Sequence, residues 1–382
     1  MFNKKGKNNI LNFNLYVLMS TFARDLIELF VGLILYKNGF SLKTIILFYV
    51  FIYAFSIMLC YPLVKLGKKT SNKVSTMVSV LAYGIFLYYL ANVKISIFYI
   101  LTISFFYGLY RSGYWISRRY YNFRVIKKND IAVNSSIVSI TNQLAKIVAV
   151  YVSSIFLETV STEVLTSIAS LIYAFSLIPL SKIEFEHDKN NTKINIPSTF
   201  KKLDFQNIYM IGSYELVKMV QFLIPLYLYI YIEKSFKIVG IMGVYTNVSM
   251  LIFAYLYGKS VDKNKNMLQL SVLLTVFAYA LKINVFGIAL ILISFMEGIV
   301  TRMYDVSISN EVFHLSKKFE YNNYNLAYEL ILNLFRMGAC VILYLFVADV
   351  KVMIYVLLLF IIIGVLLKFE QPDLKDYLYE KK

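Results

Sequence analysis

The chain has 382 residues, of which 59% are hydrophobic and only 16% are charged, and its mean hydropathy is +0.64. Soluble domains carry about 45–50% apolar and about 25% charged residues, so this composition excludes an ordinary soluble protein. A net charge of +17 would suit a nucleic-acid-binding protein, but most Lys and Arg fall on one alternating set of loops between apolar runs. That asymmetry orients a membrane protein, so we expect a lipid bilayer and no nucleic acid as partner.

Apolar runs long enough to cross a bilayer as helices follow one another along the whole chain. We expect about twelve transmembrane helices, over roughly 10–36, 42–64, 74–91, 95–118, 131–157, 160–180, 205–232, 238–257, 267–281, 285–304, 324–347 and 352–367. The boundary between 267–281 and 285–304 is marked only by Lys282 and Asn284. The predicted fold class is therefore all-α and integral to the membrane.

The longest polar stretch inside the chain falls near its middle and divides the predicted helices evenly. We predict a six-helix half over residues 1–182, a cytoplasmic linker over 183–204 and a second six-helix half over 205–382. With an even number of spans and basic loops on one side, both termini are expected in the cytoplasm. A composition rich in Lys, Asn, Ile and Tyr suggests an AT-rich bacterial genome, so we expect a multi-pass protein of the bacterial cytoplasmic membrane.

The two predicted halves carry one local similarity. The segment Gly108–Ser117 can be aligned with Gly298–Ser307, with matching Gly, Tyr and Ser residues at equivalent positions of the fourth and tenth helices. A parallel internal repeat places matches at such positions, although three matches are also compatible with chance.

Charged residues inside the apolar runs are the most informative feature of the sequence. An ionised side chain at the bilayer centre costs about 2.5–3.5 kcal/mol on insertion scales, and such residues usually mark functional sites. The predicted helices contain six acids and six bases: Asp25, Glu28, Glu215, Glu297, Asp305, Glu329, Arg24, Arg111, Lys146, Lys218, Arg302 and Arg336.

The spacing of these charges suggests partners for some of them. Residues three or four apart share a helix face, which pairs Arg24 with Glu28, Glu215 with Lys218, and Arg302 with Asp305. Asp25 is offset by about 100° from Arg24 around the helix, so it is expected to face a base on another helix. Helices 131–157 and 324–347 each present an amide and a base on one turn, Asn142 with Lys146 and Asn333 with Arg336. Such a combination suits a polar interior cavity.

Two interpretations of these charges remain open. They can be ion pairs that only fix the register of the helices, or they can line a central cavity. Their distribution favours the cavity, because they concentrate in the first, fourth, fifth, seventh, tenth and eleventh predicted helices and are almost absent from the others.

This distribution resembles the major facilitator superfamily, in which the first, second, fourth and fifth helices of each half line the central cavity. The segment after the eighth predicted helix, with Gly258, Asp262 and Lys263, is similar to the family's cytoplasmic gate motif. The corresponding segment after the second helix has Gly67 but no Asp, which leaves a latch in the first half in doubt. The resemblance implies a transporter that works by alternating access.

Other local patterns also resemble small bacterial members of this family. They are the Tyr114-Trp115 pair at the end of the fourth helix and the Glu329, Asn333, Arg336 pattern of the eleventh. The fifth helix, 131–157, contains neither Gly nor Pro, so it lacks the antiporter motif of drug exporters.

No enzyme motif is present in the sequence. There is no nucleotide-binding G-x-x-x-x-G-K-[ST], no G-x-S-x-G, no H-E-x-x-H and no Cys/His cluster, so we expect no catalytic residues, no ATP, no metal and no cofactor. Cys60 and Cys340 lie in apolar runs and are expected to be packing residues. His187 and His314 are expected in cytoplasmic loops, which argues against a histidine proton relay.

The leading hypothesis is a secondary active transporter for a small solute, coupled to protons. A low dielectric favours the protonated form of a carboxylic acid, and a nearby base favours the ionised form. A carboxylate that exchanges its basic partner for a proton can therefore couple the flux of protons to the flux of the solute. The proton-coupling candidates are Glu28, the first choice for its midplane depth, and Asp25, Glu215, Glu297 and Glu329. The substrate-binding candidates are Arg24, Arg111, Lys146, Asn142, Lys218, Asn333 and Arg336, which could hold an anionic or zwitterionic solute. The alternative is a non-transporting scaffold, immunity or accessory protein that retains the fold.

Overall fold

The structure is a computed structural model that describes residues 4–125, 131–183, 196–257, 267–316, 319, 321–346 and 349–369. Every regular element within these ranges is a helix. The predicted all-α fold class is therefore confirmed for the part of the chain that the structure describes.

Eight helices precede the predicted linker and form the N-terminal set. They are α1 (Lys4–Asp25), α2 (Val31–Lys37), α3 (Leu42–Lys69), α4 (Asn72–Ala91), α5 (Ile97–Val125), α6 (Ile131–Thr159), α7 (Thr162–Phe175) and α8 (Leu177–Ser181). Three of them begin at a serine, Ser41, Ser71 or Ser161, whose hydroxyl accepts a hydrogen bond from the N–H three residues later. These caps satisfy backbone donors that the first turn of a helix leaves free.

The remaining helices begin with α9 (Ile196–Lys202), and those after it form the C-terminal set. These are α10 (Phe205–Tyr227), its π-helical continuation η1 (Leu228–Ile232), α11 (Phe236–Tyr257), α12 (Met267–Lys282), α13 (Ile288–Ser316), α14 (Tyr321–Phe346) and α15 (Val350–Phe369). Pro225 precedes the π-helical turn; proline has no N–H and disturbs the regular hydrogen-bond ladder.

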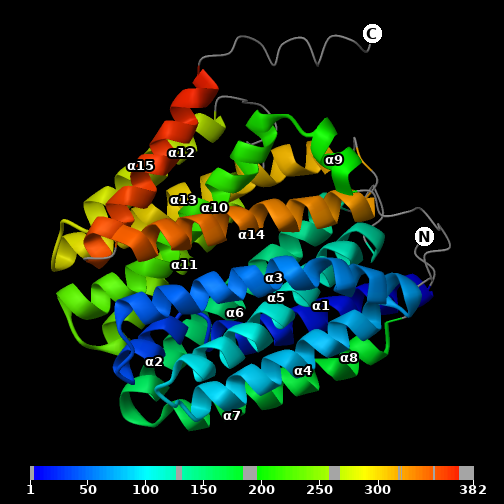
Figure 1. The fold of residues 1–382 in the computed structure, drawn as a ribbon, viewed down its shortest axis with the longest axis horizontal. Helices are drawn as coiled ribbons and strands as arrows, with labels where there is room; N and C mark the ends of the chain where they lie inside the picture. The colour runs from blue at the N-terminus through cyan, green and yellow to red at the C-terminus, as the bar shows by residue number, and fades with distance from the viewer. Residues whose placement is uncertain are drawn as a thin grey trace.

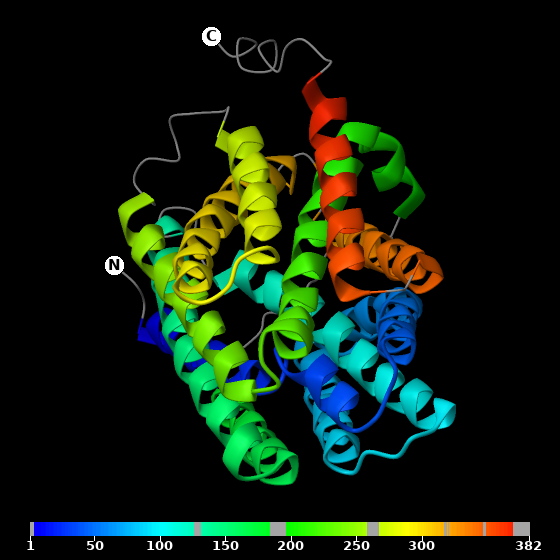
Figure 2. The ribbon, with the colours of Figure 1, turned by 90° about the vertical axis from the view of Figure 1, so that its left-hand side faces the viewer.

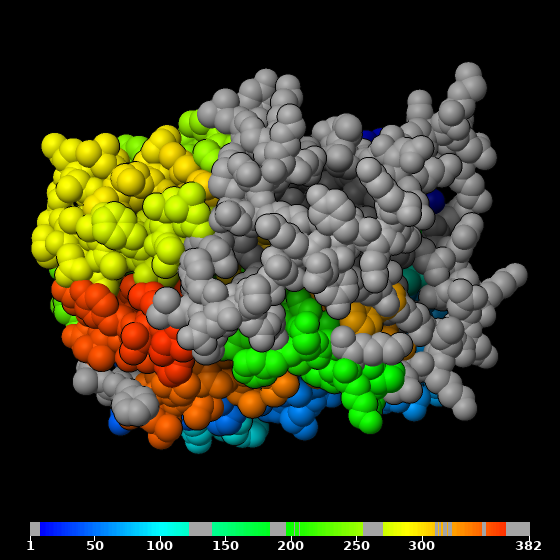
Figure 3. Space-filling view, turned by 90° about the horizontal axis from the view of Figure 1, so that it is seen from above, coloured from blue at the N-terminus to red at the C-terminus, as the bar shows by residue number. Residues whose placement is uncertain are grey.

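The two sets lie on opposite sides of the molecule, the N-terminal set at the bottom and the C-terminal set at the top of Figures 1 and 2. Two helix pairs join them: α14 packs along α3, and α11 packs along α6. Seen from above, Figure 3 shows the yellow segment of the C-terminal set beside the red α15, in agreement with the packing of α12 against α15. The division at residues 183–204 remains a prediction, and residues 184–195 lie outside the described part.

Seven helical segments are long and apolar enough to cross a membrane, counted over the described residues: Leu42–Lys69, Asn72–Ala91, Ile140–Thr159, Thr162–Ser181, Asn207–Ile232, Phe236–Ala254 and Asn323–Leu345. Two shorter apolar segments, Leu270–Lys282 and Val350–Ile363, accompany them. The chain is therefore a multi-pass membrane protein. Helices α1, α5 and α13, which carry interior charges, are not among the seven long segments. The total of twelve spans therefore stays a prediction.

Several predicted boundaries differ from the structure. The first predicted helix, 10–36, is wrong as a continuous element, because α1 and α2 are separated by turns over residues 26–30. The fourth and tenth predicted helices end too early, since α5 and α13 continue to Val125 and Ser316. Arg119 and His314 therefore lie in helices rather than in loops, because a helix can extend beyond its apolar stretch.

The similarity of Gly108 and Gly298 has a counterpart in the packing. A Cβ added to Gly108 would lie 2.9 Å from the carbonyl oxygen of Ile52 on α3, and one added to Gly298 would lie 3.0 Å from the carbonyl carbon of Thr246 on α11. Both glycines thus allow close contact between a charged helix and the backbone of a neighbour. Helices α5 and α13 use this contact against the helices that join the two sets.

Candidate functional site

The break between α1 and α2 places a carboxylate in the interior. Here backbone hydrogen bonds between residues three apart replace part of the regular α-helical pattern. They run from the Ile27 N–H to Arg24 O (3.0 Å) and from the Phe30 N–H to Ile27 O (2.9 Å). Glu28 lies in the middle of these turns. Interrupted helices in transporters present backbone groups and charges at binding sites, which makes this break the starting point of the candidate site.

Arg24 holds both acids of the break. Its Nε and Nη2 donate to Asp25 Oδ1 at 3.0 and 2.9 Å, and Nε also lies 2.9 Å from Glu28 Oε2. The expected pairing of Arg24 with Glu28 is confirmed, but the expectation that Asp25 faces a base on another helix is wrong. The long Arg24 side chain curves back to its neighbour, which the Cβ direction alone did not reveal.

Two residues of α5 approach Glu28 from the other side. Tyr107 donates a hydrogen bond to Glu28 Oε1 (3.3 Å), and Arg111 Nη1 lies 3.9 Å from the same oxygen. The Glu28 side chain is 38% exposed, whereas that of Asp25 is 5% exposed. Glu28 is thus bound by three side chains and still accessible.

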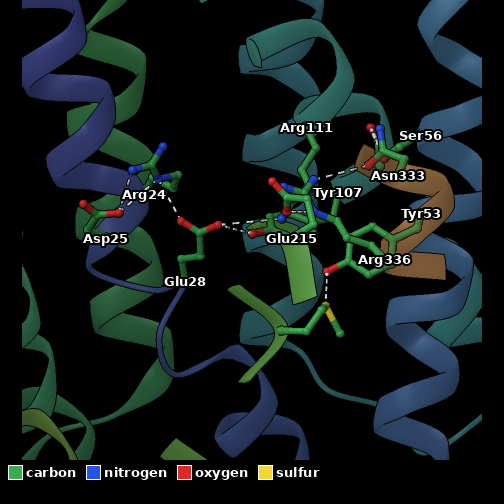
Figure 4. A network of polar contacts seen from close by, with 12 residues as sticks. Arg24, Asp25, Glu28, Tyr53, Ser56, Tyr107, Arg111, Glu215, Asn333 and Arg336 are labelled. Carbon is green, nitrogen blue, oxygen red and sulfur yellow. Dashed lines mark hydrogen bonds and ion pairs between the residues drawn. The ribbon is translucent and has the colours of Figure 1, made fainter. Parts of the chain in front are cut away.

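Tyr53 of α3 connects the N-terminal part of the site with the C-terminal part. Its ring lies 5.5 Å from Arg111 Cζ and 5.7 Å from Arg336 Cζ, so two guanidinium groups from different sets lie over one ring. Arg336 of α14 binds Glu215 of α10, with Nε donating to Oε2 at 2.5 Å. Figure 4 shows how these residues of α3, α5, α10 and α14 converge near the α1–α2 break.

Three more ion pairs are formed among the described residues. Lys218 Nζ is 2.8 Å from Asp305 Oδ1, Lys282 contacts Glu297, and Arg119 contacts Glu329. The pairs expected within single helices, Glu215 with Lys218 and Arg302 with Asp305, do not form. Each acid instead binds a base from another helix, because a polar face inside a bundle is directed at its neighbours.

Asn333 connects the cluster to Glu329. It donates to the carbonyl oxygen of Glu329 (2.9 Å) and to its Oε2 (3.2 Å), and its Oδ1 accepts from Arg336 Nη1 at 3.4 Å, so the predicted combination of Asn333 and Arg336 on one turn is present. Lys146 and Asn142 are half-buried on α6 and make no hydrogen bond or ion pair with the described residues, although Lys146 lies close enough to Glu28 to act on its charge. The predicted gate residues Gly258, Asp262 and Lys263, and also His187, lie outside the described residues.

The sequence analysis missed several residues of these networks. Arg119 and Lys282 were assigned to loops, but they lie inside helices and bind Glu329 and Glu297. Lys282 is 2% exposed, which its place at a weak helix boundary did not indicate. Tyr53 and Tyr107 carried no signal, since the chain contains 33 tyrosines. Within the described residues no group of three His, Cys, Asp or Glu could hold a metal ion, and Cys60 and Cys340 are buried and free.

Solved structures with a similar fold exist. The chain is similar to the nucleoside transporter NupG, with a TM-score of 0.67 and 14% identity over 96% of this chain and 100% of that one. A point mutant of NupG, in which an alanine replaces an aspartate, matches with a TM-score of 0.68 and 11% identity, over 94% of this chain and 99% of the other. No family model matches the sequence. No curated protein matches it either.

These comparisons confirm the expected resemblance to transporters at the level of the fold. Both matched structures are of a transporter.

Proposed function

We propose that this chain is a secondary active transporter of the bacterial cytoplasmic membrane, which moves a small solute by alternating access and is coupled to protons. The fold it shares with solved transporters supports the general class. ATP and a cofactor have no part in this proposal, since the sequence offers no motif for either.

The observation that carries proton coupling is the position of Glu28. Among the proton-coupling candidates it alone has a side chain more than 5% exposed, at 38%. It is also in reach of Arg24 and Arg111, two bases that favour its ionised form. Protonation of Glu28 would release both bases, and its deprotonation would bind them again. A carboxylate that alternates between these states can link proton entry to a rearrangement of the site.

Alternating access requires two bodies that move relative to each other. We infer that residues 1–182 and 205–382 are these bodies and that the pairs α3–α14 and α6–α11 keep them together during the movement. At the end of the bundle near α9, Arg119 of α5 contacts Glu329 of α14. On the α6–α11 pair, the Phe236 N–H donates to Glu158 Oε2 at 2.8 Å. Release of one such contact at a time would open one side of the membrane.

Flux measurements in vesicles test the proposal. A metabolite screen for thermal stabilisation of the purified protein supplies a ligand, whose labelled form is then followed in proteoliposomes with an imposed pH gradient. We expect gradient-driven flux in the native protein and its loss in Glu28→Gln. Glu233→Gln, which changes an exposed acid in the same way, is the matched control and should retain the flux.

The two failures have different meanings. If Glu28→Gln retains gradient-driven flux, the assignment of Glu28 as coupling residue is wrong. If the native protein binds a ligand but moves it under no gradient, the alternative of a non-transporting scaffold, immunity or accessory protein replaces transport.

A further inference from the structure

The interior charges of the chain are not balanced once the structure is taken into account. The predicted helices held as many acids as bases, but Arg119 and Lys282 are additional bases inside helices. Each binds one of the acids already counted, Glu329 and Glu297. Two further acids, Glu215 and Asp305, bind Arg336 and Lys218. None of these four acids remains to neutralise the bases around the α1–α2 break.

Counted in this way, the helices hold two more bases than acids. Arg302 of α13 is one of the two, and the other lies at this break. Asp25 and Glu28 are contacted by Arg24 and Arg111, and Lys146 of α6 lies close enough to Glu28 to act on its charge, so this group carries a formal charge of +1. Arg24 donates from Nε and Nη2 to carboxylate oxygens within 3.0 Å, while its Nη1 is buried without a hydrogen-bond partner in the described part of the chain. The other two bases, Arg111 and Lys146, have no carboxylate oxygen of the described residues this close.

Arg111 has the weakest ion contact of the arginines in this cluster. Its closest carboxylate oxygen is 3.9 Å away, beyond a good hydrogen bond, whereas Arg336 donates to Glu215 at 2.5 Å. Arg111 Nε is buried without a hydrogen-bond partner in the described part of the chain. Lys146 of α6 makes no ion pair with the described residues, and it is half-buried like Arg111. A cation that is only weakly neutralised inside a membrane protein is costly, so a site that keeps Arg111 and Lys146 in this state is suited to an anion from outside the protein.

We propose that the transported solute is a small organic anion whose carboxylate or phosphate group binds between Arg111 and Lys146, next to Glu28. The ring of Tyr53, which already lies against two guanidinium groups, would contact the remainder of the solute. This inference rests on the proposed transport function and goes beyond it by naming the class of substrate. It also separates this chain from a transporter of neutral nucleosides.

Binding to matched ligand pairs tests the charge of the substrate. The purified protein in detergent is screened for thermal stabilisation with organic anions, each paired with a neutral analogue. Hexanoate and hexanamide form the carboxylate pair, and uridine monophosphate and uridine form the phosphate pair. Trp115, the single tryptophan of the chain, has its ring 5.6 Å from Arg24 Cζ, so its fluorescence reports ligands at the break. We expect the stabilising ligands to be anions and their neutral partners to have no effect.

Substitutions at the break should change anion affinity in opposite directions. Lys146→Gln removes a base next to the anion and should weaken binding by roughly tenfold. Glu28→Gln removes an acid next to the anion and should strengthen binding. Arg111→Gln should act like Lys146→Gln, while Arg111→Lys, which keeps the charge, should retain most of the affinity. Lys43→Gln removes an exposed lysine and should leave binding unchanged.

Several outcomes would overturn the proposal. A neutral analogue that binds as well as its anion, a screen in which no anion stabilises the protein, or Glu28→Gln and Lys146→Gln shifting affinity in the same direction would each do so. The measurement needs no pH gradient, so a loss of proton coupling and a loss of anion selectivity are distinguished.

Discussion

Arg119 of α5 and Glu329 of α14 form an ion pair that joins the N-terminal set to the C-terminal set. The contact is extended by Asn325, whose Oδ1 accepts from Arg119 Nε at 2.6 Å and whose Nδ2 donates to the carbonyl oxygen of Ile116 at 3.2 Å. The Arg119 guanidinium also lies 5.1 Å from the ring of Tyr328. Helix α14, which carries Glu329, also packs against α9, as Figure 1 shows.

The two partners of this pair should contribute unequally to stability. The Glu329 side chain is 3% exposed and that of Arg119 is 26% exposed. Arg119→Gln leaves a buried carboxylate without its base and should cost about 3–5 kcal/mol, whereas Glu329→Gln leaves a cation that water can reach and should cost less. Melting temperatures of the purified variants should therefore rank Arg119→Gln below Glu329→Gln.

The double variant provides the control for this pair. Because the two residues interact directly, the double variant with Arg119→Gln and Glu329→Gln should lose less stability than the two single variants lose in sum. Additive losses would contradict a direct interaction between them.

Asp25 and Glu28 share Arg24 but should have different roles. Asp25 is almost fully buried and accepts two hydrogen bonds from the guanidinium, so Asp25→Asn should lower the melting temperature strongly. Glu28 is 38% exposed and its loss leaves Arg24 paired with Asp25, so Glu28→Gln should lower it only slightly. Gradient-driven flux should respond most to Glu28→Gln. A large drop in melting temperature for Glu28→Gln, with little for Asp25→Asn, would reverse this assignment.

Lys282 and Glu297 are expected to stabilise the C-terminal set without binding solute. Their side chains are 2% and 5% exposed, and Thr246 donates a further hydrogen bond to Glu297 Oε2 at 3.3 Å. Lys282→Met alone should destabilise the protein by about 3–5 kcal/mol, and adding Glu297→Met should recover much of the loss, because an apolar pair replaces an ion pair well. Thermal unfolding measures both effects, and ligand binding by the double variant checks that the site is intact.

The candidate acids could be predicted because an ionised side chain in an apolar run is conspicuous. Glu28, Glu215 and Glu329 stand in segments that are mostly apolar, and all three take part in interior ion pairs. The partners were less predictable, since they depend on which helices are neighbours. Lys218 finds Asp305 on α13 rather than an acid of its own helix.

Other features left no usable trace in the sequence. The break after Asp25 contains neither Gly nor Pro, so no backbone signal distinguishes it from a continuous helix. Arg119 and Lys282 stand at the ends of apolar runs, where a charge usually belongs to a loop. Both are in interior ion pairs because α5 continues past its apolar stretch and α12 ends against α13.

The glycines of α5 and α13 allow a test of the packing between equivalent helices. Gly108→Ala would bring a methyl group 2.9 Å from the carbonyl oxygen of Ile52, and Gly298→Ala would bring one still closer to the carbonyl oxygen of Thr246 and to the Ser249 hydroxyl. Neither backbone can easily move away, so each substitution should destabilise the protein by about 1–3 kcal/mol. The matched control is Gly338→Ala on α14, where an added Cβ meets nothing within 4 Å and should stabilise the helix by up to about 1 kcal/mol. Thermal unfolding of the three variants checks the order, and an unchanged or raised melting temperature for Gly108→Ala or Gly298→Ala would contradict the close helix contacts.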